Sequence, residues 1–209
     1  MIVKHTDPWT HYTWEDFLTF DEQKYVYDQC LDVLDVQSYQ DDSFFLLNGE
    51  IQNNAGLHLN YGNELHNKIT AQLYEFSNHI GYTDNVQWSF NATITKDFKQ
   101  KQLFPHNDDY AELKQYGNGM LKVLIYLGTG TDDYTDWGTK LYKTAQRESF
   151  GKEVTYQPGT CFVFEANKYS YHGTDFTNGI NGYRFMISGE LVESGPRQTS
   201  PRKGVQVGK

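Results

Sequence analysis

The chain has 209 residues, of which 38% are hydrophobic and 16% aromatic, a composition that predicts a folded protein with a core rich in tyrosine and phenylalanine. The formal net charge of −9 disfavours unassisted binding along a nucleic-acid backbone. The sequence has no run of about 20 apolar residues that could span a bilayer, and its N-terminus lacks the pattern of a secretory signal. We therefore expect a cytoplasmic protein with no membrane partner.

The first amphipathic segment follows Thr19 and Glu22, which have the spacing of a capping box. Apolar residues then recur at helical intervals, and the pattern predicts a helix over residues 21–35. A short apolar run after it, SFFLL at 43–47, predicts a strand.

A second helix is predicted over residues 62–80. Its apolar residues fall on one stripe at intervals of three and four: Leu65, Ile69, Leu73, Phe76 and Ile80. Gly81 stands where the helix should end, because glycine readily adopts the left-handed conformation that closes a helix. The two helices together are expected to cover one face of a sheet.

The character of the sequence changes after Gly81, and short β-type runs alternate with clusters of Gly, Asn and Asp. The predicted strands cover residues 86–95, 101–106, 120–127, 139–143, 153–156, 160–165, 169–172 and 182–192. Many short antiparallel strands behind two helices predict a mainly β (α+β) fold with a jelly-roll core, a double-stranded β-helix. We expect one domain over residues 1–192, with helical support in 1–85 and the jelly roll in 86–192, followed by a polar, flexible tail at 193–209.

The segment LFPHNDDY contains the first candidate metal ligands, His106 and Asp108. Side chains two residues apart at the end of a strand project from the same face, so one imidazole and one carboxylate can reach one ion. A His-x-Asp pair also arises by chance, and a polar turn is an adequate alternative explanation for it.

His172, in NKYSYHGTDF, supplies a third candidate ligand at the predicted end of another short strand. The turns of a jelly roll bring such strand ends together. Two histidines and one carboxylate on one side of an ion leave positions open for other ligands, which suits non-haem Fe(II), although Zn²⁺ accepts the same ligands.

Arg184 lies within the apolar segment GYRFMISGEL. A buried guanidinium needs a polar partner, and its planar fork suits the carboxylate of a dicarboxylic acid. An internal Asp or Glu, or exposure at a sheet edge, would explain the arginine as well.

The order of these residues resembles that of the 2-oxoglutarate/Fe(II) dioxygenase superfamily, in which a His-x-Asp pair is followed by a distal histidine and then by an arginine. The resemblance extends to MLKVLIYLG at 120–128, WGTKLY at 137–142 and QPGTCFVFEAN at 157–167. It covers about residues 86–192 and is strongest to the prolyl hydroxylases, including the oxygen-sensing ones.

The resemblance implies Fe(II) bound by His106, Asp108 and His172, with 2-oxoglutarate and O2 as co-substrates and ascorbate as an optional reductant. It implies that Arg184 and the Tyr126 hydroxyl hold the far carboxylate of 2-oxoglutarate. The implied reaction hydroxylates a C–H bond of a peptidyl, for example prolyl, or small-molecule substrate and releases succinate and CO2. The intact carboxylate at position 108 favours hydroxylation over halogenation, because Ala or Gly there would open a halide position.

Two positions depart from the resemblance. Many prolyl hydroxylases have a second co-substrate tyrosine shortly before the first metal histidine, whereas this chain has Thr95 and Lys96 near that position. Lys122 stands where a threonine is common. Its ammonium either faces the pocket or is exposed at the start of the strand, and we expect the exposed position.

Three other interpretations stay open. A cupin-like metalloprotein that does not use 2-oxoglutarate fits less well, because such sites usually carry three or four histidines. A structural β-sandwich would make the three candidate ligands ordinary turn residues. A nucleic-acid-directed member of the same superfamily is disfavoured by the acidic charge. The candidate substrate-contacting aromatics lie in two loops, 108–119 and 128–138: Tyr110, Tyr116, Tyr134 and Trp137.

Overall fold

The computed structural model describes residues 1–36, 63–81, 87–97, 102–108, 120–128, 137–175 and 184–194. These ranges contain two long helices, α1 (Phe20–Val36) and α4 (Asn63–His79). The larger antiparallel sheet has the strand order β1 (Ile2–His5), β2 (His11–Trp14), β8 (Cys161–Glu165), β5 (Met120–Leu127), β10 (Arg184–Ser194) and β3 (Gln87–Asp97). The smaller antiparallel sheet has the order β4 (Gln102–His106), β9 (Tyr171–Asp175), β6 (Thr139–Tyr142) and β7 (Phe150–Val154).

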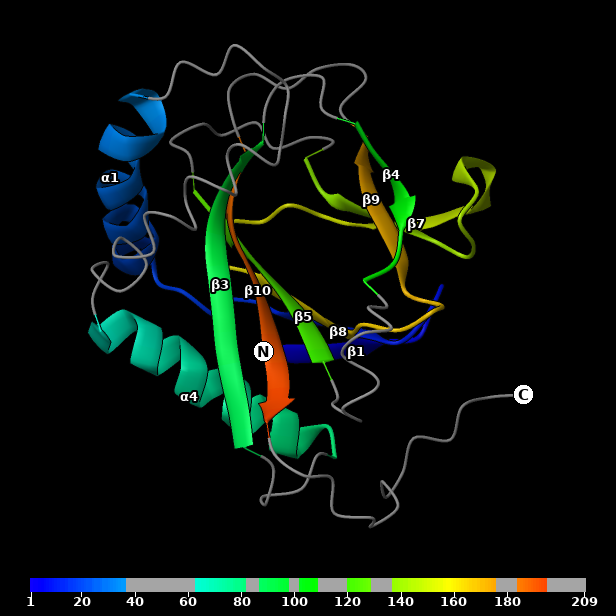
Figure 1. Cartoon of the computed structure of the whole chain (residues 1–209), viewed down its shortest axis with the longest axis horizontal. Coiled ribbons are helices and arrows are strands. Elements are labelled where there is room, and N and C mark those ends of the chain that lie inside the picture. Colours follow the sequence, from blue (N-terminus) through cyan, green and yellow to red (C-terminus); the bar gives the residue numbers. More distant parts are fainter. Residues whose placement is uncertain are drawn as a thin grey trace.

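The two sheets and the helices form three layers, with the large sheet in the middle (Figure 1). Strand β5 is buried on both faces, as its almost continuous apolar sequence predicts. Its side chains alternate between the two apolar clusters. Leu121, Val123 and Ile125 pack in the cluster shared with the helices, whereas Leu124 and Tyr126 pack in the cluster shared with the small sheet.

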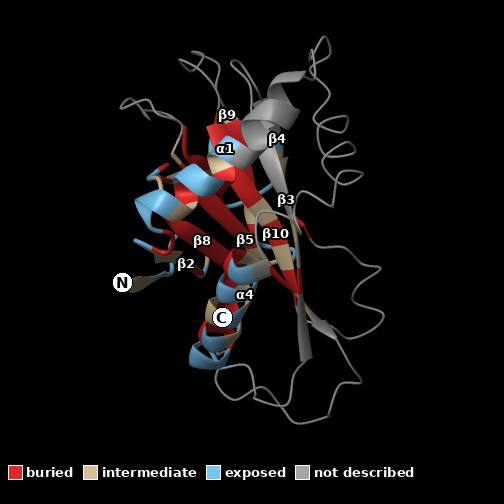
Figure 2. Cartoon of the chain, turned by 90° about the vertical axis from the view of Figure 1, so that its left-hand side faces the viewer, coloured by how far each residue is buried: buried red, intermediate tan, exposed pale blue. Residues whose placement is uncertain are grey.

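Both predicted helices are confirmed. The capping box closes the start of α1, since the Glu22 amide donates to the Thr19 hydroxyl at 3.3 Å and the Thr19 amide donates to the Glu22 carboxylate at 2.9 Å. Helix α4 ends at His79, and Gly81, which has a φ of 100°, follows it in the turn. The outward faces of both helices are exposed and the strands behind them are buried (Figure 2).

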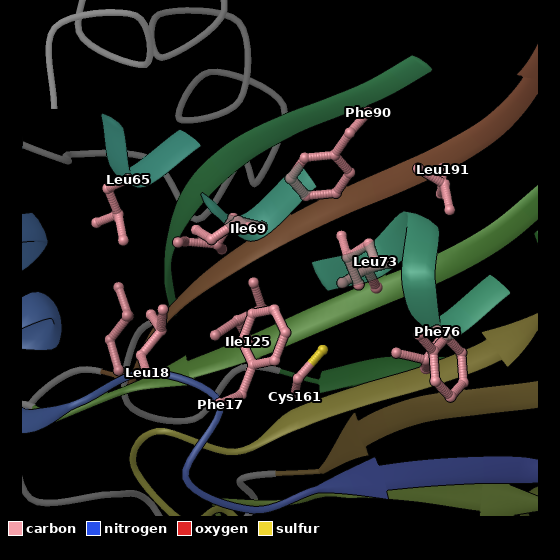
Figure 3. Packing of buried hydrophobic residues seen from close by; sticks show 14 of the residues in the cluster. Phe17, Leu18, Leu65, Ile69, Leu73, Phe76, Phe90, Ile125, Cys161 and Leu191 are labelled. Carbon is pink, nitrogen blue, oxygen red and sulfur yellow. The ribbon is translucent and has the colours of Figure 1, made fainter. Parts of the chain in front are cut away.

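The apolar stripe of α4 packs against the large sheet as predicted. Leu65, Ile69, Leu73 and Phe76 point towards Ile125 and Cys161 of the sheet, and Phe17 and Leu18 close the cluster (Figure 3). Most of the free energy that holds the helices in place comes from this burial, because residues on such a stripe contribute about 1.5 to 3 kcal/mol each when fully buried.

The architecture is the predicted jelly roll, a double-stranded β-helix with helices on one outer face. Among the described residues, no helix is both long and apolar enough to cross a membrane. The predicted strand at 43–47 lies outside the described residues, as does the tail from residue 195 onwards. Strand β10 continues to Ser194, two residues beyond its predicted end.

The N-terminal hairpin was not predicted from the sequence, and two strands are shifted from their predicted positions. Strands β1 and β2 have four residues each, and they extend the large sheet because β2 pairs with β8. The strand predicted at 153–156 spans Phe150–Val154 instead, because it is an edge strand in which only Val154 is buried. These segments carry a weak hydrophobic pattern, since short or edge strands bury few side chains.

The strand predicted at 169–172 is also shifted and spans Tyr171–Asp175. Asn167 and Ser170 form a turn, in which the Asn167 side chain accepts from the Tyr169 amide at 2.8 Å and the Ser170 hydroxyl donates to the Asn167 carbonyl at 2.9 Å. His172 therefore lies at the beginning of its strand, where the sequence had indicated the end.

Candidate metal centre

His106 and His172 come from neighbouring strands of the small sheet. His106 is the last residue of β4, and it is paired directly with His172 near the start of the antiparallel strand β9. Their ring centroids lie 4.3 Å apart, and the ring of Phe164 packs edge-on against His172 at 4.8 Å. The antiparallel pairing thus brings together two residues that are 66 positions apart in the sequence.

Asp108 follows β4 by two residues and reaches both imidazoles. Its carboxylate oxygens lie 3.3 Å from Nε2 of His172 and 3.9 Å from Nε2 of His106. Asp108 and His172 are buried, while His106 is partly accessible. One potential ligand atom from each of the three residues lies within 4.8 Å of the other two, so the predicted convergence is present in the structure.

The two histidines are oriented in the same way by the backbone. Nδ1 of His106 donates to the Phe104 carbonyl at 2.9 Å, and Nδ1 of His172 donates to the Ser170 carbonyl at 3.0 Å. Because a carbonyl can only accept, the proton of a neutral ring stands on Nδ1 and the lone pair on Nε2. Both lone pairs then face Asp108, an arrangement typical of histidines that bind a metal through Nε2.

The protonation states in this cluster also suit a metal ion. Burial lowers the pKa of His106 below its ordinary value, and the neighbouring His172 lowers it further, so the neutral ring is favoured. Burial alone would raise the pKa of Asp108, but the adjoining His172 ring and the Lys122 ammonium hold this pKa well below its usual range, so the carboxylate is ionised. Two neutral imidazoles and one carboxylate are the forms that ligate a divalent cation, so these residues fit Fe(II) or Zn²⁺.

Arg184 begins β10 and is almost completely buried, with 1% of its surface exposed. It shares the inner face of β10 with Met186, which packs in the cluster between the sheets. Its guanidinium donates to the carbonyls of Trp137 at 2.8 Å and Gly138 at 3.3 Å. Exposure at a sheet edge, one of the alternatives open at the sequence level, is therefore wrong.

Tyr126 lies on the same inner surface, next to Met186 across the β5·β10 pairing. Its hydroxyl is 2.8 Å from the Thr139 hydroxyl. Burial raises the pKa of Tyr126 to about 12, so the phenol keeps its proton and is available as a hydrogen-bond donor. Tyr126 and Arg184 thus both lie on the face of the large sheet that is turned towards the small sheet.

Lys122 faces the candidate site, and the expectation that it would be exposed is wrong. Its ammonium lies 3.2 Å from Glu190, its direct partner across the β5·β10 pairing, and 3.9 Å from Asp108. Only 16% of the Lys122 side chain is exposed. Lys122 and Tyr126 are four residues apart on β5. Because side chains alternate along a strand, both face the interior between the sheets.

Trp137 is one of the four loop aromatics, which could contact a substrate or cover the edge of the core. It is 2% exposed and packs against Tyr156 between the sheets. The other three loop aromatics, Tyr110, Tyr116 and Tyr134, lie outside the described residues. Thr139 and Glu190 also contact candidate residues and were not predicted from the sequence. The alternation of side chains along β6 and β10 is the signal that could have indicated them.

The jelly roll with this inward-facing residue set has the fold of the prolyl hydroxylases. Solved structures with the same fold include a prolyl-4-hydroxylase of Pseudomonas putida, at 14% sequence identity and a TM-score of 0.56, with 90% of this chain and 88% of that chain covered. They also include the viral collagen prolyl hydroxylase of Paramecium bursaria Chlorella virus-1, at 13% identity and a TM-score of 0.58, with 92% of this chain and 95% of that chain covered. No family model matches the chain, and neither does any curated protein sequence. The likeness therefore concerns the fold.

Proposed function

We propose that the protein is a 2-oxoglutarate- and Fe(II)-dependent dioxygenase that hydroxylates a C–H bond of its substrate. The observation that carries the proposal is the convergence of His106, Asp108 and His172 inside a jelly roll, with both Nε2 atoms turned towards the carboxylate. The two backbone carbonyls that fix the rings give each histidine a single ligating nitrogen.

In this proposal the three residues hold Fe(II) and leave the remaining coordination positions to 2-oxoglutarate and O2. The bound iron and co-substrate supply the oxidation itself, with succinate and CO2 as co-products. Asp108 contributes the single negative charge of the ligand set, and its retention supports hydroxylation over halogenation. The Phe164 ring packs edge-on against the ring of His172 and helps to fix its position.

Arg184 and Tyr126 are proposed to hold the far carboxylate of 2-oxoglutarate. A buried guanidinium binds a carboxylate more strongly than it does in water, because little solvent competes for its hydrogen bonds. The Trp137 and Gly138 carbonyls hold the Arg184 guanidinium in place, and the protonated phenol of Tyr126 adds a donor from the neighbouring strand. Orienting the co-substrate in advance reduces the entropy lost on binding.

The substrate that we would test first is a peptide that contains proline. Both solved structures named above are prolyl hydroxylases, one described as acting on collagen. A small molecule is the second class to test. Ascorbate is included in these assays as a reductant, since Fe(II) must stay reduced between turnovers.

The proposal is tested by titrating 2-oxoglutarate into the anaerobic Fe(II) protein and recording its visible absorption. A weak metal-to-ligand charge-transfer band that appears in the wild type and is absent from Asp108→Ala supports the proposal. If metal binds and no band develops at any 2-oxoglutarate concentration, the proposal is wrong, and a cupin-like metal site replaces it. Release of succinate on admission of O2 then provides an independent readout of turnover.

A further inference from the structure

Thr174 is a buried polar residue to which the proposed mechanism gives no role. It lies on β9, with 5% of its surface exposed, two residues after His172. Within the part of the chain that the structure describes, its hydroxyl has no hydrogen-bond partner. A buried hydroxyl without a partner destabilises a folded protein, whereas a valine of the same shape would not. The position therefore calls for an explanation.

The strand pairing places this hydroxyl between the two parts of the candidate site. Because side chains alternate along a strand, Thr174 faces the same side as His172. His172 is opposite Leu141 and Gly173 is opposite Lys140 in the β6·β9 pairing. The next step of the same register brings Thr174 opposite Thr139, and side chains at directly opposed positions have Cβ atoms about 5 Å apart.

Thr139 lies beside Tyr126 and Arg184, the two residues proposed to hold the co-substrate carboxylate. Its hydroxyl bonds the phenol of Tyr126, and the residue before it, Gly138, accepts from the Arg184 guanidinium. Thr139 and Thr174 are both buried. A line of three hydroxyls, from Thr174 through Thr139 to Tyr126, thus leads from the His172 side of the small sheet to the inner face of the large sheet.

We propose that Thr174 is a further binding residue for the dicarboxylate co-substrate, and that its hydroxyl donates a hydrogen bond to the carboxylate held by Arg184. This inference rests on the proposed function. A carboxylate accepts several hydrogen bonds at once, so donors from Arg184, Tyr126 and Thr174 can act on the same group from both sheets. The cost of the unpartnered hydroxyl is then offset only when the co-substrate is bound.

The test compares the affinity for 2-oxoglutarate among variants of the full-length, anaerobic Fe(II) protein, measured from the charge-transfer band. Thr174→Val removes the hydroxyl and keeps the shape of the side chain, so we expect affinity to fall by about tenfold, the loss typical of one hydrogen bond to a charged group. Thr174→Ser keeps a hydroxyl and should stay close to the wild type. Thr174→Ala is a second hydroxyl-free variant, to be used if the valine variant does not fold.

Thr70→Val provides the matched control. The Thr70 hydroxyl is also buried and has no hydrogen-bond partner among the described residues, but Thr70 lies on α4, which packs on the face of the large sheet that is turned away from the candidate site. We expect this variant to bind 2-oxoglutarate like the wild type. In the absence of co-substrate, the melting temperatures of both valine variants should equal or exceed that of the wild type, because each variant removes an unpartnered buried hydroxyl.

Two results would overturn the inference, and they are distinguishable. If the wild type binds 2-oxoglutarate and Thr174→Val binds it equally well, Thr174 has no part in the site while the proposed function stands. If the wild type itself binds Fe(II) without any response to 2-oxoglutarate, both the inference and the proposed function are wrong. Weaker binding by Thr174→Val with unchanged Fe(II) affinity supports the inference, since a general structural defect would also reduce Fe(II) affinity.

Discussion

His106 and His172 are directly opposed across the β4·β9 pairing, and each donates Nδ1–H to the carbonyl of the residue two positions before it. The two rings are therefore fixed by the same local device on two strands that run in opposite directions. The consequence is that both Nε2 atoms point towards Asp108, which lies beyond the end of β4. Three ligands are thus positioned by a regular β ladder and one short extension of it.

Replacement of Asp108 by Asn should abolish tight metal binding while the fold is kept. The amide retains the shape of the carboxylate and removes its charge. Substitutions of residues that only support the ligands typically lower metal affinity by roughly tenfold to hundredfold, and we expect the affinity of Asp108→Asn for Fe(II) or Mn²⁺ to fall by more than that. Isothermal titration calorimetry under anaerobic conditions measures this loss. Circular dichroism checks the fold, and Asn107→Ala serves as the control at the neighbouring position. Unchanged metal affinity in Asp108→Asn would exclude the carboxylate as a ligand.

Replacement of Arg184 should affect co-substrate binding more than metal binding. Arg184→Lys keeps the charge and loses the planar fork, whereas Arg184→Met loses both, so the weakening of 2-oxoglutarate binding should be about tenfold or more for Lys and larger for Met. The Fe(II) affinity of both variants should stay close to that of the wild type. Both variants also lose contacts to the Trp137 and Gly138 carbonyls, so their melting temperatures should fall. Equal losses of Fe(II) and 2-oxoglutarate affinity would indicate a purely structural role.

The helices and strands that were predicted correctly are those whose buried face produces a clear pattern of apolar residues in the sequence. Helix α4 has a continuous apolar stripe and β5 is apolar at every position except Lys122, and both elements lie where they were expected. The N-terminal hairpin was missed because four-residue strands are too short to show a period. The boundary of β9 was misplaced because an aromatic sequence, Tyr169 to Tyr171, resembles a strand, while the hydrogen bonds of Asn167 hold its first part in a turn.

The candidate site was predicted in its residues and only partly in its geometry. The spacing of His106 and Asp108 indicated a shared face, but their approach to His172 depends on strand pairing, which a single sequence does not specify. Lys122 was assigned to the solvent from its place near the strand start. Its spacing from Tyr126 predicts the inward position correctly, since residues four apart on a strand share a face. The unpartnered Thr174 hydroxyl becomes apparent only once the surrounding residues are known.

The N-terminal hairpin carries a histidine whose burial should make stability depend on pH. His11 is fully buried, stacks on His5 at 4.7 Å and donates Nδ1–H to the Trp9 carbonyl at 2.9 Å. Burial lowers the pKa of His11 to about 4, and the nearby charges of His5 and Lys152 also lower it. The Trp9 carbonyl and Asp7 act in the opposite direction.

Because the folded state resists protonation, the stabilisation is fully present above the unfolded pKa near 6.5 and is lost as the pH falls towards 4. Between pH 6.5 and pH 5 the free energy of unfolding should decrease by about 2 kcal/mol through this residue. Urea unfolding at several pH values measures the effect. His11→Phe should have a flatter profile, and His79→Gln, at an exposed position, should retain the profile of the wild type. Identical profiles for wild type and His11→Phe would show that another group is responsible.

Gln23 of helix α1 forms one hydrogen bond to the residue that follows β5 and one to the segment that precedes α1. Its buried amide donates to the Leu18 carbonyl at 3.1 Å and accepts from the Gly128 amide at 3.1 Å. Gln23→Ala should lower the free energy of unfolding by about 2 kcal/mol, because both backbone groups lose a partner. Gln23→Glu keeps the acceptor but turns a buried carboxylate oxygen towards the Leu18 carbonyl, so its loss should be at least as large. Gln157→Ala, at an exposed position, is the control in urea unfolding.

Gly159 provides a second test of the same junction. Its φ of +81° is unfavourable for other residues, and a Cβ there would lie 2.7 Å from both the Gln23 amide and the Leu18 carbonyl. Gly159→Ala should therefore destabilise the protein by at least about 1 kcal/mol. The substitution should remain destabilising in a Gln23→Ala background, because removing the glutamine relieves one contact and leaves both the Leu18 carbonyl and the backbone strain. A double variant as stable as Gln23→Ala alone would show that the glutamine side chain, and not the backbone, requires glycine at this turn.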